Sequence, residues 1–169
     1  MPEAIRRQIV KFESGIRGDL PVKWVKFENL HVTLKFLGEV ADDNVPTAIL
    51  QAEEVRGRFK PFETSLDGIG CFPDRNNPRV VWIGVKDGAD ALINLQKDLD
   101  RSLAELGFET DERFHPHLTI GRTKKKCDLS SVLDKNFSSE KFIVKGYILF
   151  KSTLTPQGPI YEVVKVFNS

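Results

Sequence analysis

The first apolar residues of the chain are spaced like one face of a helix. They recur every three or four positions after Pro2, and the run ends at the glycines at positions 15 and 18. Proline at the first helical position and glycine after the last one are typical helix boundaries. The sequence therefore predicts an amphipathic helix with an apolar stripe of Ile5, Ile9, Phe12 and Ile16.

The next segment, residues 22–40, follows a different pattern, in which apolar and polar residues alternate around "LHVTLKFLG". Alternation predicts an extended strand, because successive side chains of a strand point to opposite faces. Val32 and Leu34 then share one face. The opposite face carries His31, Thr33 and Lys35.

The same two patterns predict the remaining elements. Helical spacing occurs in residues 41–59 and 88–106, with a leucine stripe in the second segment, and a short helix is expected near 128–137. Extended segments are predicted at 62–72, 79–85, 114–122, 141–152 and 159–167. This succession of helices and strands predicts an α+β fold.

The order of helix, alternating strand and helix occurs twice, and each alternating strand contains the phrase His-x-Thr. The phrases, at residues 31–33 and 117–119, use two of the three histidines of the chain. We interpret the chain as a duplication. The second-half helix follows the predicted strand 79–85, whereas no strand precedes the first helix. We expect either a strand of about six residues upstream of Met1 or two unequal lobes.

The charge balance limits the kind of partner. Lys and Arg total 25 against 24 Asp and Glu, which gives a net charge of +1. Such a chain lacks the basic field of proteins that bind duplex nucleic acid without sequence preference. We therefore expect any nucleic acid to be held at an end or a short segment. The apolar content of 40% is enough for an ordinary core.

The cysteines and the apolar runs indicate the compartment. Cys71 and Cys127 lack zinc-ligand spacing and are expected as free thiols in a reducing cytosol, with one disulfide as the alternative. No apolar run reaches the ~18 residues of a membrane helix, and the charged N-terminal segment does not resemble a secretion signal. We expect a cytoplasmic protein with no membrane contact.

Each phrase places an imidazole beside a hydroxyl on one face of a strand. If the fold brings the two strands together, His31, Thr33, His117 and Thr119 surround one point. This set suits phosphoryl transfer without a metal. One histidine would take a proton from the attacking oxygen, the other would give one to the leaving oxygen, and the hydroxyls would hold the non-bridging oxygens.

A zinc site is the alternative interpretation of the histidines. His115 lies two residues before His117, and with His31 the three imidazoles could surround a metal with an open position. That site would leave the threonines without a role and would not explain why His-x-Thr occurs twice. Because Pro116 restricts the residue before it, we expect His115 at the rim of the site with no catalytic role.

Several residues near the phrases are less specific candidates for substrate contacts. Arg122 could reach a phosphate or pair with an acidic neighbour, and Trp82 and Phe114 could stack on a base or belong to the core. The basic loop 124–126 could meet a nucleic-acid backbone, although a solvated loop is the simpler interpretation of the three lysines. Lys35, Arg122 and this loop are the few basic residues near the phrases.

With both phrases and their flanks in view, the sequence resembles the 2H phosphoesterase superfamily. Within it, "KWVKFENLHVTLKFLGEV" and "FHPHLTIGR" are similar to the two signature segments of the RNA 2′,3′-cyclic phosphodiesterases, also called 2′-5′ RNA ligases. The resemblance implies a bilobal α+β fold with pseudo-twofold symmetry. It places two antiparallel sheets around a V-shaped cleft, with the helices outside. Members usually begin with an apolar strand that this chain lacks.

The resemblance also implies an activity and roles. It implies hydrolysis of a 2′,3′-cyclic phosphate at an RNA 3′ end to a 2′-phosphate, with reversible 2′-5′ joining in some members and without metal or cofactor. His31 would be the proton donor and His117 the proton acceptor, with Thr33 and Thr119 as phosphate ligands.

We expect a single bilobal domain over residues 1–169. Lobe one is expected mainly in 1–75 and lobe two mainly in 76–169, with the C-terminal strands exchanged between lobes as an open option. The expected state is a monomer without a protein partner. Two other functions stay open, namely a module that binds RNA ends or nucleotides with little turnover, and a cyclic phosphodiesterase for a small nucleotide.

Overall fold

The computed structural model describes residues 1–156 and 158–169. Its helices are α1 (Glu3–Ser14), α2 (Val45–Arg58), α3 (Ala89–Ala104) and α4 (Ser130–Leu133), with 3-10 turns at Phe27–Asn29 and Asp42–Asn44. Its strands are β1 (Val22–Trp24), β2 (Phe62–Thr64), β3 (Leu66–Phe72), β4 (Val80–Val85), β5 (His117–Thr123), β6 (Phe142–Val144), β7 (Gly146–Thr155) and β8 (Gly158–Asn168). Antiparallel pairing of the long strands confirms the α+β class.

The contacts of the chain form two compact units, each built from three segments. Unit one comprises Met1–Thr33, Glu63–Ala89 and His115–Phe142. Unit two comprises Leu34–Phe62, Asp90–Phe114 and Ile143–Ser169. These units interleave along the chain and differ from the expected sequential division near residue 75. The expected arrangement of duplicated lobes around a V-shaped cleft stays a prediction.

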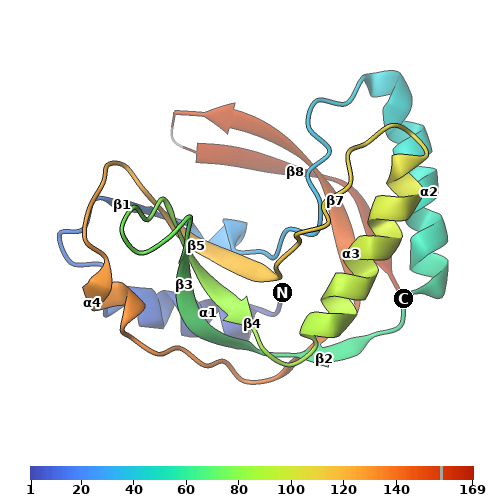
Figure 1. Ribbon diagram of the computed structural model, residues 1–169. Helices are drawn as coiled ribbons and strands as arrows, with labels where there is room; N and C mark the ends of the chain where they lie inside the picture. Colours follow the sequence, from blue (N-terminus) through green and yellow to red (C-terminus); the bar gives the residue numbers. More distant parts are fainter. Residues whose placement is uncertain (157) are drawn as a thin grey trace. The chain divides into compact units, whose positions relative to one another are not determined.

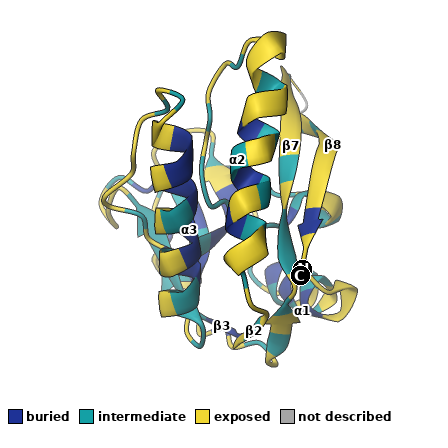
Figure 2. Cartoon of the chain, turned by 90° about the vertical axis from the view of Figure 1, so that its right-hand side faces the viewer, coloured by how far each residue is buried: buried dark blue, intermediate teal, exposed yellow. Residues whose placement is uncertain are grey.

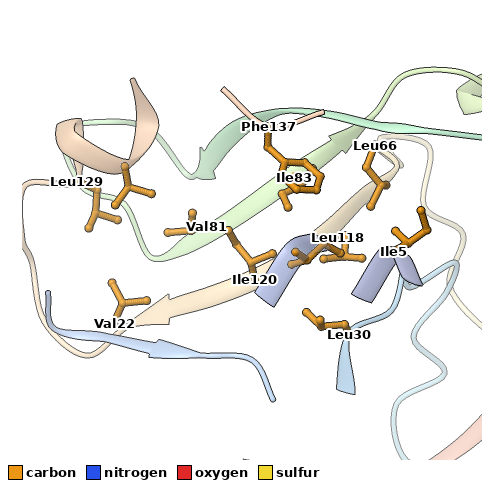
Figure 3. Packing of buried hydrophobic residues seen from close by; sticks show 12 residues of the cluster. Ile5, Val22, Leu30, Leu66, Val81, Ile83, Leu118, Ile120, Leu129 and Phe137 are labelled. Carbon is orange, nitrogen blue, oxygen red and sulfur yellow. The ribbon is translucent and has the colours of Figure 1, made fainter. Parts of the chain in front are cut away.

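Unit one is organised around a four-stranded antiparallel sheet in the order β1-β5-β4-β3 (Figure 1). Its central strand β5 pairs with β4 along one edge and with β1 at the end of the other edge. One face of the sheet is packed with apolar side chains from β4, β5 and α1 (Figure 3). Leu118 and Ile120 of β5 are fully buried there. The opposite face of β5 is therefore the one that can carry polar chemistry.

The amphipathic helix predicted at the N-terminus is α1, and its apolar stripe covers the sheet of unit one. Ile5 and Ile9 are almost completely buried in the same cluster as Leu118. Glu13, also on this side of the helix, is fully buried and forms an ion pair with Arg17 at 2.9 Å. The predicted helix and its orientation toward the core are thus confirmed.

The segment 22–40 is not one continuous strand, in contrast to the prediction from its alternation. β1 ends at Trp24, a 3-10 turn follows, and Val32 makes an isolated antiparallel bridge to Leu118. The reason lies in the core. The turn carries Leu30 into the apolar cluster, where none of its surface is exposed, before the chain returns to the edge of β5. Burial of one leucine stabilises this excursion by about 2 kcal/mol.

Unit two consists of α2, α3 and the antiparallel hairpin β7–β8 (Figure 2). The leucine stripe predicted for residues 88–106 faces inward along α3, where Leu95, Leu99 and Leu103 are buried. They share a cluster with Phe167 of β8. Within the described residues, no helix combines the length and apolar character that a membrane span requires.

Candidate active site

The two His-x-Thr phrases meet in unit one at a single antiparallel bridge. Val32, at the centre of the first phrase, pairs with Leu118, at the centre of the second. In antiparallel register, this pairing brings His31 beside Thr119 and Thr33 beside His117. The two segments that carry the phrases therefore lie next to each other, as a site shared by the four residues requires.

The four polar side chains share the face of the sheet that lies opposite the core. Val32 and Leu118 pack into the apolar cluster, and side chains alternate along each strand. The histidines and threonines on either side of them must point away from that cluster. All four are half-buried, so they are partly shielded from water and still accessible to a ligand.

Each phrase histidine is oriented by a backbone carbonyl two residues before it. The distance from His31 Nδ1 to the Asn29 oxygen is 2.6 Å, and that from His117 Nδ1 to the His115 oxygen is 2.7 Å. Because a carbonyl can only accept a hydrogen bond, Nδ1 is the protonated nitrogen of each neutral ring. Nε2 is then the nitrogen that can exchange a proton with a substrate.

Burial lowers the pKa of the His31 imidazole, because desolvation disfavours its charged form. The hydrogen bond to the Asn29 carbonyl acts in the opposite direction, whereas the positive charge of Arg6 on α1 lowers the pKa further. His31 is therefore mainly neutral at pH 7 in the free protein. An anion bound next to it would favour the protonated form.

Aromatic rings surround His117 on the face of the sheet. Its ring centroid lies 5.1 Å from that of Phe72 and 6.2 Å from that of Trp82. The His115 ring packs on the same side, 5.4 Å from Trp82. Trp82 is half-buried and pairs in register with Thr119. The cluster gives one side of the site flat apolar surfaces next to an imidazole.

Glycines on the neighbouring strands make room for this cluster. A Cβ atom at Gly70 of β3 would lie 2.2 Å from Cζ2 of Trp82, so the indole ring lies directly over the glycine backbone. Gly84 of β4 pairs in register with His117 and presents no side chain beside the imidazole. The indole Nε1 of Trp82 is buried and lacks a hydrogen-bond partner among the described residues.

The comparisons with known proteins identify the family of the chain. A family model described as the 2'-5' RNA ligase superfamily matches residues 1–146. The chain belongs to this superfamily. The match covers both phrases and confirms the resemblance noted from the sequence.

Relatives in this superfamily share a consistent name. The chain is 42% identical to an RNA 2',3'-cyclic phosphodiesterase of Archaeoglobus fulgidus over 96% of this chain and 90% of the relative. It is 38% identical to the protein of the same name from Methanocaldococcus jannaschii, over 98% and 94% of the two chains.

Solved structures of the superfamily have the same fold. A crystal structure of a Thermus thermophilus protein matches with a TM-score of 0.89 and 28% identity, over 99% of this chain and 93% of that one. The complex of E. coli LigT with 3'-AMP matches with a TM-score of 0.79 and 27% identity, over 99% and 92%.

The remaining residues that the sequence suggested as substrate contacts lie in several parts of the structure. Arg122 is exposed on β5, where it pairs in register with Lys23 of β1. The lysines 124–126 are exposed after the end of that strand. Phe114 belongs to unit two, as the last residue of its segment Asp90–Phe114. Trp82 alone among the aromatic candidates lies in unit one beside a phrase histidine.

Lys35, counted from the sequence among the basic residues near the phrases, is not available to nucleic acid. Its side chain is only 6% exposed and forms an ion pair with Asp100 in unit two. Alternation of the sequence placed it with the polar residues of the phrase, but the strand pattern ends before it. An ammonium group enclosed by protein acceptors cannot also meet a phosphate backbone.

Sequence reasoning missed the backbone carbonyls of Asn29 and His115, and the ring of Phe72. The only sequence signal for these carbonyls is their position, two residues before His31 and two residues before His117. In the structure, the carbonyl oxygen of His115 lies 2.7 Å from Nδ1 of His117. Within residues 1–156 and 158–169, no group of three or more His, Cys, Asp or Glu side chains could hold a metal ion.

Proposed function

We propose that this protein hydrolyses 2′,3′-cyclic phosphates at RNA 3′ ends, with a 2′-phosphate and a free 3′-hydroxyl as products. The observation that carries the proposal is the bridge between Val32 and Leu118, because it gathers two imidazoles and two hydroxyls on one face. The names of the relatives, RNA 2',3'-cyclic phosphodiesterase, support the same activity.

In the proposed mechanism, the neutral His117 is the general base. Its Nε2 accepts a proton from a water molecule while the water oxygen attacks phosphorus. His31 is the general acid, protonated on Nε2, and gives its proton to the 3′ oxygen as the bond between phosphorus and that oxygen breaks. The carbonyls of Asn29 and His115 keep both reacting nitrogens in place. After one turnover the two rings have exchanged protonation states, and solvent restores them.

The low pKa of His31 is compatible with this acid role once substrate is bound. The cyclic phosphate carries a negative charge, and a nearby anion raises the pKa of an imidazole. The free protein thus holds His31 neutral, and the substrate itself favours the form that the reaction needs. His31 therefore gains its proton mainly in the complex.

Thr33 and Thr119 are proposed to bind the non-bridging phosphate oxygens. In register they lie beside His117 and His31 respectively, so each imidazole has a hydroxyl donor next to it. Arg122, exposed at the end of the same strand, is a candidate for a neighbouring phosphate. Trp82 is a candidate for stacking on the base, since its ring lies next to that of His117.

A 2′-5′ joining reaction would use the same two histidines in the same roles, with the 5′-hydroxyl of a second RNA in place of water. That hydroxyl would give its proton to His117 while His31 protonates the departing 3′ oxygen, and the roles would exchange only when the 2′-5′ linkage is cleaved back. The superfamily name includes this activity. We propose it as a secondary activity of the same site.

Small nucleotides are a second candidate substrate class. The solved complexes of E. coli LigT with 3'-AMP and with ATP favour it, because both ligands are single nucleotides. A site formed by half-buried residues on one sheet face could hold a cyclic nucleotide or the terminal nucleotide of RNA. The reacting group is the same in both cases.

The decisive experiment is a substrate panel with a chelator present. It would contain an oligoribonucleotide ending in 2′,3′-cyclic phosphate, the same oligonucleotide ending in 3′-phosphate, and 2′,3′-cyclic AMP. We expect turnover of the cyclic oligonucleotide to a 2′-phosphate, with EDTA having no effect. Faster turnover of cyclic AMP would favour the small-nucleotide function, and binding without turnover would favour a binding module. Loss of activity with EDTA and its return with zinc would support the metal site instead.

A further inference from the structure

A buried polar network in unit two encloses the carboxylate of Asp100 on α3. Lys35 donates to one of its oxygens at 2.5 Å, and Gln96 and the backbone N–H of Asp111 donate to the other at 2.7 Å each. Lys35 also donates to the carbonyl oxygen of Glu109. One side chain of α3 thus holds two segments that are distant in the sequence.

Both of those segments lead directly into the phrases. Lys35 follows Thr33 by two residues, and Asp111 precedes His117 by six residues. Asp100 and Gln96 lie on α3, whereas Lys35 and the loop at 109–111 lie outside all of the described elements. The network therefore adds a polar restraint to irregular chain whose neighbouring apolar residues, Leu34, Leu37 and Phe108, pack against the cluster of unit two.

The network is buried and ionic, which makes it costly to disturb. Gln96 is 1% exposed and Asp100 is 6% exposed. Burial alone raises the pKa of the Asp100 carboxyl, but the hydrogen bonds from Lys35 and Asp111 outweigh it, so the pKa is lowered and the group is ionised. Removing one partner would leave the other charge buried and unpaired.

We infer that Lys35, Asp100 and Gln96 are positioning residues for the reaction at the phrases. They fix the segment after Thr33 and the segment before His117 to α3. This restraint limits the movement of Thr33, the proposed phosphate-binding residue, and of His117, the proposed general base. A displacement of about 1 Å at a reacting group can cost 10²-fold in rate, so such restraint affects turnover as well as stability. The inference rests on the proposed function of Thr33 and His117.

The test compares turnover with stability in a double variant. Lys35→Met combined with Asp100→Leu removes both charges, so no buried ion is left unpaired and the folded state is expected to survive. The ties to Glu109 and Asp111 are nevertheless lost. We expect a melting temperature near that of the wild type, and a kcat about 10- to 100-fold lower with little change in KM. A folded double variant with wild-type kcat would overturn the inference.

Ser102→Ala is the matched control. Ser102 is also a buried polar residue of α3, but its hydroxyl bonds to Gln51 of α2 and touches neither phrase segment. The variant should lower the melting temperature and keep kcat. If both variants lowered kcat in proportion to stability, the network would be structural only.

A milder variant covers the case in which the double variant does not fold. Gln96→Met keeps the ion pair and removes the amide that donates to Asp100 and, at 3.4 Å, to the carbonyl of Asp111. We expect a folded protein with kcat several-fold lower and faster hydrogen exchange at the Asp111 amide. An unchanged kcat would contradict the inference.

The two proposals can fail separately. If the wild-type protein does not turn over the cyclic oligonucleotide, the proposed function fails, and positioning is then read from the NMR signals of the His117 and His31 rings. The double variant should shift or broaden the His117 ring signals, and Ser102→Ala should not. Unchanged ring signals in the double variant would overturn the positioning role by itself.

Discussion

Val32 and Leu118 are partners in an antiparallel bridge, and this pair aligns the two His-x-Thr phrases. Both side chains pack into the apolar core of unit one, so the bridge is fixed by burial as well as by backbone pairing. The polar residues on either side are thereby directed to the opposite face. The proposed catalytic set thus depends on two apolar residues that belong to the core.

Replacing either phrase histidine should nearly abolish turnover. His31→Ala removes the proposed acid and His117→Ala the proposed base, and each should lower kcat by about 10² to 10⁴. Steady-state kinetics on the cyclic oligonucleotide measures this. His115→Ala is the control and should keep most activity, because the bond to His117 comes from the backbone carbonyl of residue 115. A His115 variant as inactive as the His117 variant would contradict the two-histidine mechanism.

The phrase threonines should matter less than the histidines. Thr33→Ala or Thr119→Ala removes one hydrogen bond to a charged phosphate, worth about 1 to 3 kcal/mol in kcat/KM. Serine at either position should restore most of the loss, since it keeps the hydroxyl. Thr123→Ala is a control on the same strand, where the hydroxyl bonds to the Pro78 carbonyl at 2.9 Å. If Thr123→Ala cost as much as Thr119→Ala, the phosphate role would lose its support.

The pH dependence of kcat/KM should be bell-shaped. Burial lowers the pKa of His31 in the free enzyme, so its protonated form is lost at a lower pH than that of an ordinary imidazole, and kcat/KM should begin to decline before the pH reaches 6.5. A general base must be unprotonated to act, so kcat/KM should also fall on the acidic side. On the alkaline side, kcat should stay high up to a higher pH than kcat/KM does, because bound phosphate raises the pKa of His31. Identical alkaline limbs for kcat and kcat/KM would argue against this substrate effect.

His31 should also make stability depend on pH. Because its folded-state pKa lies below its unfolded value of 6.5, the unfolded chain binds more protons in that interval. The free energy of unfolding should therefore rise as the pH increases from the folded-state pKa of His31 to 6.5. This gain should be lost as the pH falls through the same interval. Urea unfolding of wild type and His31→Gln at about pH 5 and about pH 7 tests this. Equal pH dependence in the two proteins would be the contrary result.

Gly70→Ala should disturb the aromatic side of the site. The new methyl would overlap the Trp82 indole, whose Cζ2 lies 2.2 Å from the position of that Cβ. Overpacking of this kind costs about 1 to 3 kcal/mol of stability and would shift the ring next to His117. Gly57→Ala in α2 is the matched control, since its Cβ would meet nothing within 4 Å. That variant should be stabilised by about 0.5 to 1 kcal/mol.

Binding of the RNA end should depend only modestly on salt. The exposed basic residues near the second phrase are Arg122 and the lysines 124–126, and Lys35 is already paired inside the protein. A slope of about one to three released ions in a plot of log K against log salt is expected. Alanine at the three lysines should reduce the slope further. A slope like that of a protein with many duplex contacts would contradict recognition of an end.

The sequence by itself determined most of the local elements and the candidate residues of the site. Helical spacing located α1 and α3 and identified their buried stripes, because a helix repeats its face every 3.6 residues whatever lies against it. Alternation placed His117 and Thr119 on the face opposite Leu118. The repeated phrase and the scarcity of histidine identified the four candidate residues, and the family match confirms the resemblance that they carry.

Only the tertiary structure decided which distant residues lie together. The excursion at Leu30, the pairing of Val32 with Leu118, and the burial of Lys35 against Asp100 all join positions far apart in the chain. Local periodicity cannot specify such contacts, because their free energy comes from burial and from partners that the chain supplies elsewhere. For that reason the pattern placed Lys35 on the polar side of a strand, whereas packing against α3 placed its charge inside the protein.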